Sequence, residues 1–150
     1  MTHAAYEAST SSGAPVECYE FIQGLSKWYF TTGTQEFTSL ARTFIPSPVK
    51  RDRIKQGEDA LKETLTLTFP RGDEFAAQFL GFAPDLVTTL NVYRLHLTDP
   101  DKELAQYWKG RVVGAKASDN TVQVECESVF TSIKRPGLRA KFELSCRHTL

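Results

Sequence analysis

The chain has 150 residues, a length typical of one globular domain with a substantial core. Its 18 basic residues balance 18 acidic ones, so the formal net charge is zero and a general polyanion binder is not expected. No apolar run reaches the roughly 18 residues needed to cross a membrane. The first eight residues lack the features of a signal peptide, so we expect assembly in the cytoplasm.

Residues 1–14 are polar and predict an N-terminal arm, with at most a helical turn around residues 4–8. After this arm, apolar and polar residues alternate with the period of two that is typical of half-buried strands. The alternation predicts strands at 16–23, 27–32, 42–45, 61–69, 86–97, 106–115, 121–127 and 138–144. Turn-forming residues at 23–26 and 118–120 join neighbouring strands.

One segment has helical spacing instead. Phe75, Phe79 and Leu80 fall on one helical face, Asp73 is the expected N-cap, and Gly81 is the expected C′ residue. The predicted fold is therefore mainly β, an antiparallel β-barrel or sandwich-like domain over residues 15–145, with one short helix at about 73–81. The expected core contains Leu65, Leu67, Phe69, Val122, Val124, Leu138, Phe142 and Leu144.

The chain has few candidate metal ligands. The histidines His3, His96 and His148 share no ligand spacing with one another, and His96 is expected to be a partly exposed strand residue. Of the three cysteines, Cys18 and Cys126 lie on core-facing positions. Cys146 stands in a Cys-Arg-His sequence, which begins a metal site only if further ligands follow.

No catalytic motif is present, so we do not expect an enzyme. The tripeptide 71–73 predicts a turn that caps the helix rather than an adhesion motif. Acidic residues that stand in polar, loop-like stretches are expected to be solvated; they are Glu58, Asp59, Asp73, Glu74, Asp99, Asp101 and Glu103.

Two basic stretches, 50–55 and 134–141, leave open a small β-barrel that binds nucleic acid or oligosaccharide. That alternative predicts exposed aromatic side chains, such as Tyr29 and Tyr93, beside the basic residues. Because the total charge is balanced, we favour a salt-bridged contact between protein subunits and expect no nucleic-acid recognition.

Several segments carry a resemblance when they are taken together in order. They are 12–21 (SGAPVECYEF), 65–73 (LTLTFPRGD), 90–94 (LNVYR), 107–115 (YWKGRVVGA), 127–142 (ESVFTSIKRPGLRAKF) and 146–150 (CRHTL). The series resembles the tail-tip, or baseplate hub, proteins of long-tailed phages and prophages, a family related to the tail tip protein L of phage lambda. The resemblance covers nearly the whole chain.

This resemblance implies a structural protein of the virion at the distal end of the tail. Family members form a ring, expected to be a homotrimer, between the distal tail protein and the central hub or fibre protein, near the end of the tape measure. In longer members, the segment that matches 146–150 begins a C-terminal iron–sulfur domain, and Cys146 matches its first cysteine. We therefore expect no cofactor on residues 1–150 alone, and an iron–sulfur cluster only if the native chain continues.

Overall fold

The computed structural model describes residues 3–9, 11, 13–54, 63–81 and 84–134. It contains the short helices α1 (His3–Ala8) and α2 (Glu74–Ala77) and a 3₁₀ helix, η2 (Val129–Lys134). The strands are β1 (Pro15–Gln23), β2 (Ser26–Thr31), β3 (Phe37–Ser39), β4 (Arg42–Pro46), β5 (Lys50–Arg51), β6 (Thr64–Pro70), β7 (Thr88–His96), β8 (Ala105–Ala117) and β9 (Thr121–Ser128). The mainly β prediction is confirmed.

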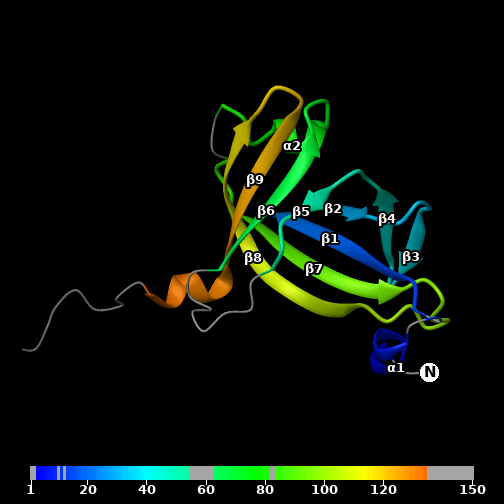
Figure 1. Cartoon of the computed structure of the whole chain (residues 1–150). Coiled ribbons are helices and arrows are strands. Elements are labelled where there is room, and N and C mark those ends of the chain that lie inside the picture. The colour runs from blue at the N-terminus through cyan, green and yellow to red at the C-terminus, as the bar shows by residue number, and fades with distance from the viewer. Residues whose placement is uncertain (1–2, 10, 12, 55–62, 82–83, 135–150) are drawn as a thin grey trace, which may run out of the picture.

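The nine strands form one sheet in the order β3-β4-β2-β1-β7-β8-β9-β6-β5. Every strand pair is antiparallel except β2 and β4, which run parallel. The sheet coils, so that β5 and β6 approach β1 and β2 (Figure 1). Within the described residues no ladder joins the two edges, so the sandwich-like form is confirmed and the closed barrel is not formed.

The main core fills the inner, concave side of the coiled sheet. The predicted core residues Leu65, Leu67, Phe69, Val122 and Val124 are all fully buried there. They belong to β6 and β9, which pair directly, Leu67 opposite Val124. Strict alternation thus identified the inward face correctly on both strands. The remaining predicted core residues, Leu138, Phe142 and Leu144, and the strand 138–144, lie outside the described residues.

The outer side of β1 carries a second, smaller core. The β3–β4 hairpin folds over this side and buries Phe37 and Phe44 against Cys18. Phe44 packs on Phe37 with ring centroids 5.3 Å apart and on Tyr29 at 5.5 Å. Because β1 is covered on both sides, almost all of its central residues are buried. Cys18 and Cys126 are both buried, as expected for structural cysteines.

The helix in the 73–81 segment is shorter than predicted. Asp73 is the N-cap and its Oδ1 accepts a hydrogen bond from the Ala76 backbone N–H at 3.1 Å, which confirms the start of the helix. The regular helix already ends at Ala77 with Gln78 as C-cap, so Gly81 is not the C′ residue. Gly81 instead has a φ of +96°, a backbone conformation that favours glycine in the following turn.

The helical turn allowed for around residues 4–8 is present as α1, and η2 is a helical element that was not expected. The predicted arm contains α1, whose Tyr6 is buried, and residues 129–134 form η2. The other boundaries are close to the prediction, including the two-residue turn at Gly24 between β1 and β2. The sequence analysis missed β3 and β5, which have only three and two residues.

We expect Leu67→Ala to lower the free energy of unfolding by about 2–5 kcal/mol, because it empties a fully buried position in the main core. Leu25→Ala is the matched control, since Leu25 is 101% exposed and should change stability by less than about 0.5 kcal/mol. Denaturant unfolding of the parent and both variants measures the difference. Equal losses for the two variants would show that the inward face is wrongly assigned.

Candidate functional site

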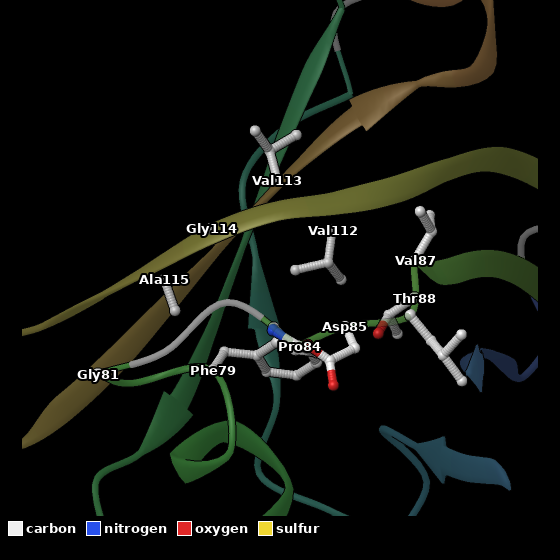
Figure 2. A pocket seen from close by; sticks show the side chains of 11 residues that line it. Phe79, Gly81, Pro84, Asp85, Val87, Thr88, Val112, Val113, Gly114 and Ala115 are labelled. Atoms are coloured by element: carbon white, nitrogen blue, oxygen red, sulfur yellow. The ribbon is translucent and has the colours of Figure 1, made fainter. Parts of the chain in front are cut away.

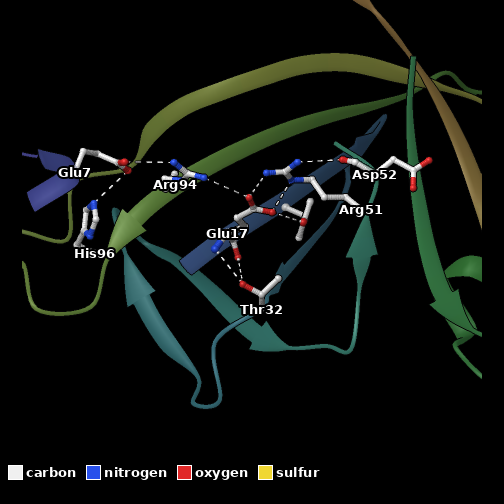
Figure 3. A network of polar contacts seen from close by, with 8 residues as sticks. Glu7, Glu17, Thr32, Arg51, Asp52, Arg94 and His96 are labelled. Carbon is white, nitrogen blue, oxygen red and sulfur yellow. Dashed lines mark hydrogen bonds and ion pairs between the residues drawn. The ribbon is translucent and has the colours of Figure 1, made fainter. Parts of the chain in front are cut away.

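A row of charged side chains lies along β1 and β7 (Figure 3). Glu17 of β1 sits at its centre and accepts hydrogen bonds from Arg51 of β5, including one of 2.7 Å from Nε to Oε2. Tyr19 donates to the same carboxylate at 2.8 Å, and Arg94 Nη2 lies 3.8 Å from it. β5 is an edge strand and β1 is a central strand, and no ladder pairs the two directly. The ion pair therefore connects two strands that are far apart in the strand order.

The environment favours the charged forms of this pair. Burial of Glu17 opposes ionisation and is the largest single influence on its pKa. The hydrogen bonds from Arg51 and Tyr19, with the positive charges of Arg51 and Arg94, outweigh it and hold the pKa of Glu17 below its ordinary value. The hydrogen bond to Glu17 raises the pKa of Arg51. Both shifts therefore favour the ionised forms of Glu17 and Arg51.

The network continues to the N-terminal helix. Arg94 Nη1 lies 3.3 Å from Oε2 of Glu7, and His96 Nε2 lies 3.2 Å from Oε1 of the same residue. His96 is only 1% exposed, so the prediction of a partly exposed strand residue is wrong. The reason is that α1 folds over the end of β7 and stacks the Tyr6 ring on the His96 ring. His3 lies against the same imidazole, with ring centroids 5.2 Å apart.

A second carboxylate, Glu20, is buried on the outer side of β1. It accepts hydrogen bonds of 2.9 Å from Asn91 Nδ2 and from Tyr93 Oη, and Arg42 Nε lies 3.5 Å away. Burial, and then the hydrogen bond to Glu20, raises the pKa of Tyr93. Tyr93 and Tyr29 are partly buried in the second core rather than displayed on an open face.

These contacts bear on the nucleic-acid alternative. Arginines do stack on tyrosines, Arg42 over Tyr93 at 5.5 Å and Arg94 over Tyr107 at 4.9 Å. Each of these arginines is also paired with a carboxylate. Binding of a phosphate backbone requires basic side chains that are free to neutralise it. For Arg42 and Arg94, the arrangement therefore favours internal ion pairing over nucleic-acid binding.

A hollow lies beside β8 (Figure 2). It has a volume of about 390 Å³, and Val112 and Ala115 of β8 face Phe79 and Pro84 across it. Among its described lining residues, Asp85 is the one acidic side chain. Glycoside hydrolysis commonly uses a pair of carboxylates, whereas the described lining of this hollow offers one.

We call a group of exposed apolar side chains the apolar rim: Leu86, Val87 and Val113 line this hollow, and Leu25 lies in the β1–β2 turn. Each is more than half exposed. The turn carrying Leu25 reaches the other members because Gln23 Nε2 donates to the Leu86 carbonyl at 3.3 Å. A Cβ placed on Gly24, which has a φ of +59°, would lie 2.9 Å from Leu86 Cδ1. Clustered apolar exposure of this kind is typical of surfaces that contact another protein.

The other predicted site residues have structural positions. Asp73 caps α2, and Arg71 donates to the Asp119 carbonyl at 2.9 Å, so the 71–73 sequence forms a capping turn, as expected. Asp99 is not solvated as predicted: it is 2% exposed and accepts hydrogen bonds from the backbone of residues 101 and 103. Cys146, His148, Glu58, Asp59 and most of the basic stretch 134–141 lie outside the described residues.

Comparisons with known proteins identify the fold but not a family. No family model matches the chain. An uncharacterized protein of Xylella fastidiosa (strain 9a5c) is 26% identical over 161 aligned residues, which cover the whole chain and 33% of that protein. A chain from the virion of a native gene transfer agent particle has the same fold, with a TM-score of 0.73 and 12% identity, over 93% of this chain and 48% of that one. This chain thus spans about a third of the relative and about half of the structural neighbour. None of the described helices is long and apolar enough to cross a membrane.

We expect Glu17→Gln to destabilise the protein by about 1–3 kcal/mol at pH 7, because Arg51 would lose its charged partner. The folded-state pKa of Glu17 lies below its ordinary value of 4.5. Its contribution to stability is therefore complete above that pH and disappears as the pH falls through the lowered folded-state value.

Unfolding free energies of parent and variant between pH 7 and pH 3 test this. Their difference should shrink below about pH 4.5. Glu125→Gln is the matched control, since Glu125 is well exposed and its ion pair with Lys116 should contribute little. A difference between parent and Glu17→Gln that stays constant down to pH 3 would contradict the assigned role.

Proposed function

We propose that the chain is a structural subunit of a phage-like particle, located at the distal end of the tail. The observation that carries this proposal is the shared fold, over 93% of the chain, with a protein from a gene transfer agent virion. The ordered sequence segments that resemble tail-tip hub proteins also support membership of a phage-like particle. In this proposal three copies form a ring between the distal tail protein and the central hub or fibre protein, near the end of the tape measure, and assemble in the host cytoplasm.

The surface supports a role in assembly. The apolar rim is built from the β1–β2 turn, the segment before β7 and the bulged part of β8, which are three separate pieces of chain. All three hold apolar side chains toward solvent at one place. In an assembled particle, neighbouring proteins can cover such a surface, whose exposure to water is otherwise unfavourable.

The polar groups support a structural rather than a catalytic role. The buried carboxylates Glu20 and Asp99 are both engaged in hydrogen bonds within the fold, and Glu17 is held ionised by two arginines. A catalytic acid or base needs a proton that can leave and return near neutral pH. The thiols of Cys18 and Cys126 are also poor nucleophiles, because burial raises the pKa of each to about 12.

Substitution of the apolar rim tests the assembly role. We expect Leu86→Asp or Val113→Asp to stop incorporation of the protein into particles. Each substitution would bury an unpaired carboxylate in an apolar contact between proteins, from which water is excluded. Leu40→Asp is the matched control: Leu40 is 77% exposed but lies in the β3–β4 turn, away from the rim. Its φ of +49° also suits Asp better than Leu.

The measurement is mass spectrometry of purified particles, with circular dichroism to show that each variant is folded. Incorporation of the parent and Leu40→Asp, with loss of the folded rim variants, is the expected result. Particles that form normally without this protein, or that lack it altogether, would contradict the proposed function. Full incorporation of both rim variants would contradict the rim as the contact surface.

We further propose an iron–sulfur cluster in a native product that continues beyond Leu150, with Cys146 as one of four thiolate ligands. The support is the resemblance of residues 146–150 to the start of such a domain, together with the greater length of the matched relative. Cys146→Ser should then remove iron and visible absorption from whole particles, whereas Ser145→Ala should not. Iron-free particles that contain a longer product would contradict the cluster.

A further inference from the structure

Two histidines and a glutamate meet where α1 packs on the end of β7. Glu7 and His3 stand one helical turn apart on α1, and His96 is the last residue of β7. One ligand atom from each of the three residues lies within 4.8 Å of the other two. Sequence spacing did not reveal this set of three, because 89 residues separate Glu7 from His96.

Two ring nitrogens of this cluster lack a hydrogen-bond partner within the part of the chain that the structure describes. His3 Nε2 and His96 Nδ1 are buried and accept or donate no hydrogen bond among the described residues. Buried side-chain nitrogens normally have a partner, so His3 Nε2 calls for an additional ligand, whereas His96 Nδ1 points away from the Glu7 carboxylate, which contacts Nε2 of that ring. A metal ion takes the lone pair of a neutral imidazole and thereby supplies that partner.

The surroundings hold the three side chains in place. Arg94 Nη1 contacts Oε2 of Glu7 at 3.3 Å, which leaves Oε1 facing the imidazole of His96 at 3.2 Å (Figure 3). The Tyr6 ring stacks on His96 at 5.7 Å, and Tyr6 Oη donates to the Thr98 carbonyl at 3.4 Å. Gly13 permits a close approach here, since a Cβ on it would lie 2.8 Å from the Tyr6 carbonyl oxygen and 3.4 Å from His96 Nδ1.

We propose that His3, Glu7 and His96 bind one Zn²⁺ ion, which fastens α1 to the end of β7. Two imidazoles and one carboxylate are an established zinc ligand set, with a water molecule in the fourth position. Ligand atoms on one tetrahedral zinc lie about 3.4 Å apart, so small side-chain rotations bring these three residues into place.

The charges around the site allow a cation. Glu7 brings a negative charge to the site, and Arg94 brings a positive one close to it. Arg94 Nη2 also lies 3.8 Å from Glu17, which is itself paired with Arg51, so these two carboxylates and two guanidinium groups together carry no net charge. Arg94 therefore acts mainly to orient the Glu7 carboxylate, as residues next to a metal ligand commonly do.

Zinc titration of the untagged full chain, after treatment with a chelator, tests the proposal. We expect one Zn²⁺ per chain by calorimetry, and binding weakened about tenfold or more by His3→Ala and by Glu7→Gln. His148→Ala is the matched control and should bind as the parent does. Co²⁺ serves as a second probe, because its visible absorption reports a four-coordinate site and should disappear when Zn²⁺ is added.

A second readout separates this site from unspecific surface binding. Hydrogen exchange of the α1 amides should slow when Zn²⁺ is added to the parent, because the metal joins the helix to β7, and should not change in Glu7→Gln. Thermal unfolding without metal shows whether each variant still folds. A folded parent that takes up no stoichiometric zinc would overturn the proposal, and so would zinc binding that is unchanged in a folded His3→Ala variant.

Discussion

The packing of one phenylalanine constrains the shape of the whole sheet. Phe75 of α2 contacts Phe21 at 4.3 Å between ring centroids, and it also packs on aromatic rings from β2 and β6. The helix that carries Phe75 has only four residues, so it cannot cover the inner face of a nine-stranded sheet. The sheet must therefore coil around this ring cluster and use its own strands to exclude water. Trp108 adds to this closure by lying across Gly110, where a Cβ would come within 2.3 Å of the indole.

Coiling without a closing ladder leaves two edges that must be held together by other means. The segment between β4 and β5 crosses from β4, next to one edge, to β5 at the other edge. Along it, the Ser47 N–H donates to the Thr31 carbonyl and Val49 is buried. Arg51 then pairs with Glu17. Part of the basic stretch 50–55, interpreted from sequence as a subunit contact, is thus used inside the fold.

Local patterns predicted the long strands well and the short elements poorly. Strands such as β6 and β9 alternate strictly because one face is buried and the other is not. The β3–β4 hairpin was missed because its two-residue turn is Leu40-Ala41 rather than a sequence containing Asn or Gly. Both residues adopt positive φ, a conformation that such turns require and that Leu and Ala rarely take. The short β5 offers only Lys50 and Arg51, too few residues for any periodicity.

The N-terminal cluster was beyond sequence analysis for a different reason. The antiparallel register of β1 and β7 places Pro15 opposite His96, so the residues before β1 must pass beside that histidine. A motif search compares residues that are near in sequence, whereas this cluster depends on a register set by the buried residues of both strands. The same register sets Glu17 opposite Arg94, which in turn holds Glu7. The position of α1 beside His96 and the contact of Glu17 with Arg94 are therefore consequences of one strand pairing, and a shift of that pairing by one residue would move Glu17 away from Arg94.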